Sequence, residues 1–409
     1  MGASKRKTWY FAYLPYSIAF GILPVLVPLY FVSSLGGSLF DLGVMTSIAI
    51  LFGIPASVFF GRLPERFGRT KPFILASFLL TGFLLIFLYE TKSVIVFQIL
   101  YVLITVTDYL HPSSTNVLIA ESYHRKSWGP AFAKYNFIAG VATAIGLTIC
   151  SIYVTSIGYR TMLLISGPLV LISFFIAIFL VEEPPIFIER WISRFERPID
   201  EVSSLAYQLD AQKYQSGESH RILKIGESPK MIHVGLGFMA FSFAGTYAFT
   251  SFPIYLSRNV LISPSTVFII FLARSVVGTF SYLIAGKFIS GQNSDSAIKV
   301  ATGMRILLVL LLPTITFVPS SLSPFIAAVI LSLFAFSWSL YSIGRSTVIM
   351  EYAKEGTLGT YEALDGIGSM AGGLLSGAIP AIYGFDTLFL TSSVFFASSL
   401  ILFIRGLRH

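Results

Sequence analysis

Long apolar runs separated by short polar clusters recur along the whole chain. A helix that crosses about 30 Å of hydrocarbon needs roughly 20 apolar residues, and twelve runs approach or exceed that length. They lie near 9–32, 40–61, 72–89, 93–121, 128–153, 159–181, 230–256, 264–288, 298–318, 323–350, 357–381 and 385–405. The pattern predicts an all-α polytopic membrane protein with twelve transmembrane helices.

Composition and charge agree with a membrane protein. Only 12% of the residues are charged, against about 25% in a soluble domain. The loops on one side carry 21 Lys and Arg residues and those on the other side carry 3, so the positive-inside rule places the first side, with both termini, in the cytoplasm. The net charge of +8 is explained by this topology, and no nucleic acid partner is expected. We expect a monomer in the cell membrane, surrounded by membrane lipids.

The sequence gives little support to enzymatic chemistry. Its single cysteine, Cys150, lies in an apolar run, and no Cys/His cluster has the spacing of a metal site. Neither a nucleophile–base pair nor a nucleotide-binding loop is present. We therefore predict a protein that is not an enzyme and needs no metal or cofactor.

The chain divides into two halves that repeat. Residues 182–229 are polar and predict a cytoplasmic linker between a half at 1–181 and a half at 230–409. Pro28-Leu29-Tyr30 matches Pro253-Ile254-Tyr255 at an offset of 225, and Gly158-Tyr159 matches Gly384-Phe385 at 226. Because each half has an even number of helices, both copies share one orientation. The expected architecture is two parallel six-helix repeats.

The loop between the second and third predicted helices carries a motif. It reads Gly61-Arg62-Leu63-Pro64-Glu65-Arg66-Phe67-Gly68-Arg69-Thr70-Lys71 and resembles the signature of the major facilitator superfamily, with Glu65 in place of the usual aspartate. Together with the twelve spans and the long central loop, the resemblance covers the whole chain. It implies a secondary transporter that works by alternating access.

The resemblance also implies a cytoplasmic gate. The glycines would permit a tight turn, and Arg69 could form a forked pair with Glu121 at the end of the fourth helix. A weaker copy in the second half would use Lys287 and Glu351. The alternative is that these charges only set topology. The gate residues so implied are Gly61, Glu65, Arg66, Gly68, Arg69, Glu121, Lys287 and Glu351.

Ionisable residues inside spans are functional candidates, because each costs at least about 2.5 kcal/mol to insert. Asp108 and His111 share a helix face, which suggests proton coupling, substrate orientation or simply a structural hydrogen bond. Arg345 and Asp365 lie at similar depth and could neutralise each other, with Glu362 as the alternative acid. Arg305 belongs to the same in-span set without an assigned role. The candidate substrate and coupling residues are Asp108, His111, Lys134, Arg274, Trp338, Tyr341, Arg345 and Asp365.

These observations predict a secondary active transporter of a small organic solute, with protons as the candidate coupling ion. The in-span cations favour an anionic or hydroxyl-rich solute. Two alternatives stay open at this point: an efflux antiporter for drugs and other amphiphiles, and a receptor or scaffold that uses the same fold without transporting. The motif and the in-span charges favour transport, because a scaffold has no need of either.

Overall fold

The computed structural model describes residues 8–123, 128–183, 229–288, 294–352 and 358–407, and this part of the chain is built from helices. The N-terminal elements are η1 (Trp9–Tyr13), α1 (Leu14–Ser33), α2 (Leu39–Phe67), α3 (Lys71–Glu90), α4 (Val94–Asp108), α5 (Leu110–Ser122) and α6 (Trp128–Leu180). The C-terminal elements are α8 (Pro229–Phe249), α9 (Phe252–Arg258), α10 (Pro264–Phe288), α11 (Ser294–Leu311), η3 (Pro313–Phe317), α12 (Ser323–Tyr352), α13 (Leu358–Tyr383) and α14 (Phe385–Gly406).

Eleven helical stretches in the described residues are long and apolar enough to cross a membrane, and one of them contains two spans. Helix α6 has non-helical torsions at Gly158, with φ 78° and ψ 162°. Cys150 Sγ lies 3.7 Å from Met162 Sδ, although twelve residues of straight helix would separate them by about 18 Å. The chain therefore reverses at Gly158. The described residues form twelve crossing segments, as the hydrophobic pattern predicts.

Prolines break two segments that the sequence predicts as single helices. The run at 93–121 divides into α4 and α5 at Tyr109, because Pro112 has no N–H for the carbonyl of Asp108 and its ring crowds that carbonyl. The run at 230–256 divides between α8 and α9, four residues before Pro253. Each run still forms one membrane span, Val94–Ile119 and Met231–Arg258, as the hydrophobic pattern predicts.

Backbone torsions repeat at the offsets found in the sequence. Gly158 and Gly384 occupy the same unusual region, the latter with φ 83° and ψ 168°. Gly36 has φ 83°, and Leu261, 225 positions later, has φ 61° as the one non-glycine residue with positive φ in the described chain. A leucine thus stands where the first copy has a glycine. These pairs agree with a duplicated fold, while the domain boundaries at 181/182 and 229/230 stay predictions.

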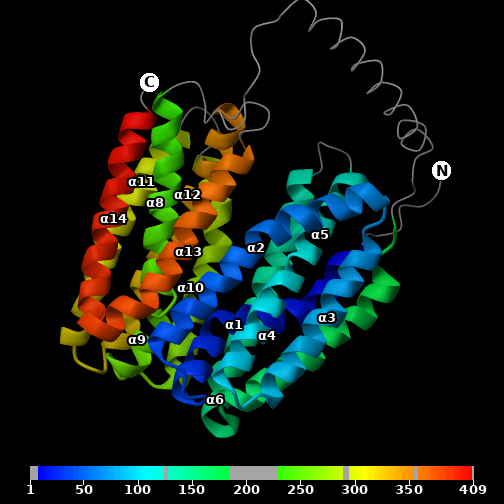
Figure 1. Ribbon diagram of the computed structural model, residues 1–409, viewed down its shortest axis with the longest axis horizontal. Helices are drawn as coiled ribbons and strands as arrows, with labels where there is room; N and C mark the ends of the chain where they lie inside the picture. Colours follow the sequence, from blue (N-terminus) through cyan, green and yellow to red (C-terminus); the bar gives the residue numbers. More distant parts are fainter. Residues whose placement is uncertain (1–7, 124–127, 184–228, 289–293, 353–357, 408–409) are drawn as a thin grey trace, which may run out of the picture.

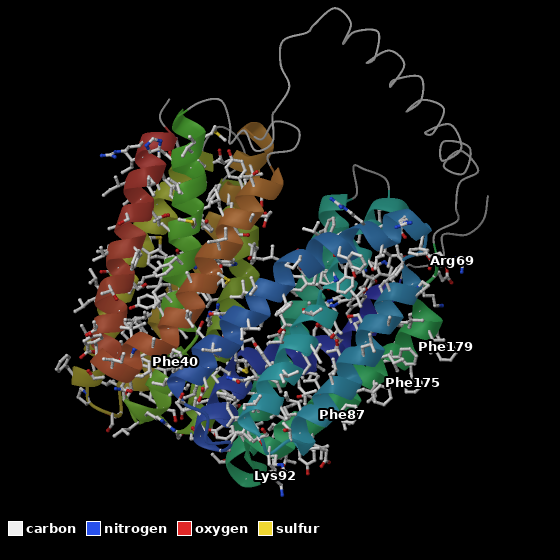
Figure 2. All side chains as sticks on the ribbon, viewed as in Figure 1. Phe40, Arg69, Phe87, Lys92, Phe175 and Phe179 are labelled. Carbon is white, nitrogen blue, oxygen red and sulfur yellow. The ribbon has the colours of Figure 1, made fainter. Side chains whose placement is uncertain are left out.

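The two halves form two lobes that lie close together at one end and diverge at the other, where α12 and α13 stand apart from α5 (Figure 1). On the N-terminal lobe, Phe87, Phe175 and Phe179 are 58%, 59% and 80% exposed and lie between Arg69 at one end and Lys92 at the other (Figure 2). Aromatic rings exposed on this scale are suited to contact with lipid tails. Lys92 marks the end predicted to face the cell exterior.

At the predicted outer end, α2 of the first half packs against α13 of the second half. The contact is a glycine seam formed by Gly43, Gly373 and Gly377, where a Cβ atom at Gly43 would lie 2.8 Å from the carbonyl oxygen of Leu374. Nearby, Ser47 donates a hydrogen bond to the carbonyl of Met370 at 2.8 Å. The two lobes are in contact at this end and diverge at the opposite end, which the sequence predicts to be cytoplasmic (Figure 1).

Candidate functional site

A cavity of about 410 Å³ lies between the two halves, beneath the glycine seam. Its two walls differ in chemistry. The N-terminal half contributes a largely apolar wall, formed by Pro24, Val27, Pro28, Leu42, Met45, Thr46 and Tyr101. The C-terminal half contributes two cations, one acid, several hydroxyls and aromatic rings: Phe241, Ser242, Thr246, Phe249, Thr250, Arg274, Arg305, Phe334, Trp338, Asp365 and Ser369.

Arg305 is the buried cation of this cavity, with 5% of its surface exposed. Its Nε donates a hydrogen bond to Ser337 Oγ at 3.2 Å, and its guanidinium carbon lies 4.7 Å from the ring of Phe241 and 5.2 Å from that of Trp338. The rings of Phe334 and Phe396 lie within 5.8 Å. In the described part of the chain no carboxylate pairs with it. The sequence marks Arg305 as an in-span charge, but only the structure places it in the cavity.

Arg274 is the second cation that lines the cavity. Its guanidinium carbon is 5.9 Å from the ring of Phe271, and within the described ranges it forms no ion pair. Arg274 lies ten residues from the start of α10 and Arg305 eleven from the start of α11, which corresponds to about 15 Å of helix. Both cations therefore lie near the middle of the membrane.

Arg345 is neutralised within the C-terminal half, as its depth predicts. Its Nη2 is 3.1 Å from Glu362 Oε1 and 3.9 Å from Asp365 Oδ1, so the alternative acid is the nearer one. Asp365 also accepts a hydrogen bond from the hydroxyl of Ser242. Since Asp365 lines the cavity, this network forms part of the cavity wall.

The candidates Trp338 and Tyr341 align with Asp108 and His111 of the first half at an offset of 230. Trp338 lines the cavity and is 43% exposed. Tyr341 is only 1% exposed and stacks on Phe241, with ring centroids 3.4 Å apart. It supports the cavity wall from behind rather than lining it.

Asp108 and His111 are brought together, although outside the lining of the central cavity. Asp108 Oδ1 accepts a hydrogen bond from the hydroxyl of Tyr16 and lies 3.4 Å from His111 Nδ1. The His111 side chain is buried among the rings of Tyr13, Tyr16 and Phe78. The helix break at Tyr109 places the two residues at the junction of α4 and α5. Helix α1 contributes Tyr16 to this group, which we call the Asp108 cluster.

Lys134 does not reach the cavity. It is exposed on α6, and its Nζ lies 4.2 Å above the ring of Tyr10. A cation over an aromatic face in this position holds the N-terminal helix η1 against α6. The described contacts give Lys134 a packing role.

The motif residues lie at the far edge of the N-terminal lobe. Helix α2 continues to Phe67, so the interpretation of Gly61 through Arg66 as a loop is wrong; Gly68, with φ 63°, ends the helix. Only Gly68 takes the conformation that favours glycine. Arg69 points away from the C-terminal lobe (Figure 2). The side chains of Glu65, Glu121, Lys287 and Glu351 lie outside the described residues, so the predicted gate pairs stay predictions.

A carboxylate from the end of α6 caps the start of α3 beside the motif. Glu183 accepts hydrogen bonds from the backbone N–H groups of Thr70 and Lys71 at 3.0 and 2.9 Å. Lys71 Nζ in turn donates to the carbonyl of Ile178 at 2.6 Å. A negative charge at a helix N-terminus and a positive charge at a helix C-terminus are both favourable. This pair ties α3 to the last turn of α6.

Comparison with known proteins agrees with the fold. The family profile described as "Major Facilitator Superfamily" matches residues 9–364. The chain belongs to the major facilitator superfamily. This membership identifies an integral membrane secondary transporter and not an enzyme.

Solved structures of the superfamily share the fold over nearly the whole chain. The crystal structure of the nucleoside transporter NupG matches with a TM-score of 0.71 and 10% identity, covering 98% of each chain. The inward open conformation of the xylose transporter XylE from E. coli matches with a TM-score of 0.68 and 14% identity, covering 97% of this chain and 95% of the other. No curated protein matches the sequence significantly. At these identities the likeness concerns the fold alone.

Proposed function

We propose that this transporter carries a small polar organic solute through the central cavity by alternating access. The observation that supports the proposal is the cavity itself, which lies near the membrane midplane and takes its lining from both halves. A solute bound there contacts surfaces that move relative to each other when the halves rock. We further propose that the protein resides in the cell membrane with both termini in the cytoplasm, as the distribution of basic residues predicts.

The chemistry of the cavity supports solute transport over the two alternatives. An efflux site for amphiphiles needs mainly apolar walls, whereas the C-terminal wall presents Arg274, Arg305 and hydroxyls of serine and threonine. A scaffold that does not transport gains nothing from cations in the membrane interior, because each costs energy to insert.

We also propose that the Asp108 cluster couples transport to protons. Asp108 is 23% exposed at its side chain and lies between Tyr16 and His111, so a change in packing around α1 alters the stability of its charge. The competing interpretation is a permanent structural hydrogen bond. Substrate orientation is less well supported, because Asp108 and His111 are not among the residues that line the cavity.

The test is transport by purified protein in proteoliposomes, with a panel of radiolabelled sugars, nucleosides, organic acids and amino acids. We expect at least one polar class to exchange across the membrane and to accumulate when a pH gradient is imposed. Asp108→Asn should abolish accumulation and retain exchange at equal pH. Full accumulation by this variant would rule out the coupling role, and the absence of exchange for every class would contradict transport.

A further inference from the structure

We propose that the solute is an organic anion with an apolar body, whose anionic head is bound between Arg305 and Arg274. This inference rests on the proposed transport function and specifies its substrate class. It follows from the contacts of the two arginines, from the pairing of the nearby acids with other residues, and from the different chemistry of the two cavity walls.

The first argument is the missing counter-charge at Arg305. Burying a charge without a partner is costly, yet Arg305 is 5% exposed and its protein hydrogen bond goes to the neutral hydroxyl of Ser337. Asp365 is the one acid among the described residues that line the cavity, and it already accepts a hydrogen bond from Ser242 and lies near Arg345. An anionic solute would supply the charge that the described residues leave out.

The second argument is the way Arg305 is held. Aromatic rings of Phe241, Trp338, Phe334 and Phe396 surround its guanidinium carbon, and Nε is used by Ser337. Stacking fixes the plane of the guanidinium and leaves its terminal nitrogens available for a bidentate contact with an oxyanion. Arg305 Nη1 lies next to Gly245: a Cβ atom placed at Gly245 would be 3.6 Å from this nitrogen. Gly245 itself lines the cavity, so this nitrogen is oriented toward the solute space.

The third argument is the opposite wall. The N-terminal half presents Pro24, Val27, Leu42 and Met45 to the same space, and these side chains have no group that pairs with an anion. They match an apolar body, which gains by leaving water. A cavity of about 410 Å³ falls within the range of pockets for small organic ligands. Carboxylate, phosphate and sulfonate heads share the required chemistry.

The experiment compares ligands of one shape with different heads. Benzoate, phenyl phosphate and benzenesulfonate are tested beside the neutral benzamide, by thermal shift of the purified protein and by flux into proteoliposomes. We expect at least one anion to raise the melting temperature and to be transported, with benzamide at least about tenfold weaker, as expected for loss of a charge-assisted contact. The head that binds best identifies the class of anion.

Substitutions then locate the site. Arg305→Gln and Arg274→Gln should each weaken the best anion at least about tenfold and change benzamide little, and Arg305→Lys should fall between because it keeps the charge without the fork. The matched control is Arg160→Gln, because Arg160 lies outside the cavity and contacts Tyr89. If Arg305→Gln fails to fold, Arg274→Gln tests the same site from an exposed side chain.

The outcomes separate the two proposals. Flux of neutral solutes with no anion bound or carried would overturn the anion site and leave transport intact. Anion binding that both glutamine variants retain would also overturn it. Anion binding lost in those variants, but with no flux of any solute, would support the site and contradict the transport function.

Discussion

The glycine seam between α2 and α13 should control whether the outer end of the transporter is closed, and Gly43→Ala is the sharpest way to disturb it. A Cβ atom at Gly43 would lie 2.8 Å from the oxygen of Leu374, 2.9 Å from the oxygen of Gly373 and 3.0 Å from the nitrogen of Gly377, against 3.4–4 Å in ordinary contact. All three atoms belong to the backbone. Since no side chain can rotate away, the two helices must separate by about half an ångström.

The cost of this overpacking is about 1–3 kcal/mol. This cost destabilises only the state in which the outer end is closed, because the seam must separate when that end opens. The better helix propensity of alanine acts in both states and cancels. At about 1.4 kcal/mol per factor of ten, the outward-open population should rise by a factor of about 5 to more than 100.

A cysteine in the cavity reports this population. Cys150→Ala removes the only native cysteine, and Thr250→Cys introduces one in the C-terminal wall of the cavity. The rate of labelling by a membrane-impermeant maleimide added outside should rise at least about fivefold in Gly43→Ala. Gly303→Ala is the control, because nothing lies within 4 Å of its Cβ position. If Gly43→Ala labels at the rate of the control, the seam does not close the outer end.

Three further predictions concern other parts of the fold. Arg345→Gln and Asp365→Asn together should lower the melting temperature by less than the sum of the two single changes, because each single change leaves a charge unpaired. Additive shifts in melting temperature would contradict the pair. Glu362→Gln should lower the melting temperature least, because the Glu362 side chain is 57% exposed. Gly158→Ala should lower the stability by about 1–3 kcal/mol, because its torsions of φ 78° and ψ 162° lie in a region that favours glycine. Leu261→Gly should not destabilise the protein, because Leu261 already has a positive φ of 61°. An equal drop in melting temperature for both variants would refute the backbone argument. Charge reversal at Arg69 or Glu121 should slow outside labelling of Thr250→Cys by favouring the inward-open state, and the double reversal should restore part of the rate; unchanged labelling in both single variants would remove the predicted gate.

The sequence predicts the twelve spans well because each must satisfy the same physical constraint, the thickness of the bilayer. It predicts the breaks poorly. Pro112 and Pro253 interrupt their helices, while Pro24 and Pro28 lie inside the continuous helix α1. A missing N–H is tolerated where neighbouring helices hold the backbone in place, and a single sequence does not show which neighbours those are.

The candidate site is predicted only in part, for a related reason. In-span charges can be found from the sequence, and Arg274, Arg345 and Asp365 are candidates on that basis. Which of them faces the cavity depends on how each helix is rotated about its axis and on which side chains far apart in the sequence pair with each other. The sequence does not predict a role for Arg305, because nothing in its local sequence reveals the four aromatic rings that surround it, which come from α8, α12 and α14.

Helix α1 links the two sites that the structure separates. Its Tyr16 donates to Asp108, while its Pro24 and Pro28 line the cavity; Tyr16 and Pro24 are eight residues, or about 12 Å, apart along the helix. The two prolines remove backbone hydrogen bonds within that helix, so its cavity-lining end can adjust without breaking a complete ladder. A solute that presses its apolar body against Pro24 and Pro28 therefore acts on the helix that holds the Asp108 cluster. Under the proposed coupling, solute and proton would need no direct contact with each other, because both would act through α1.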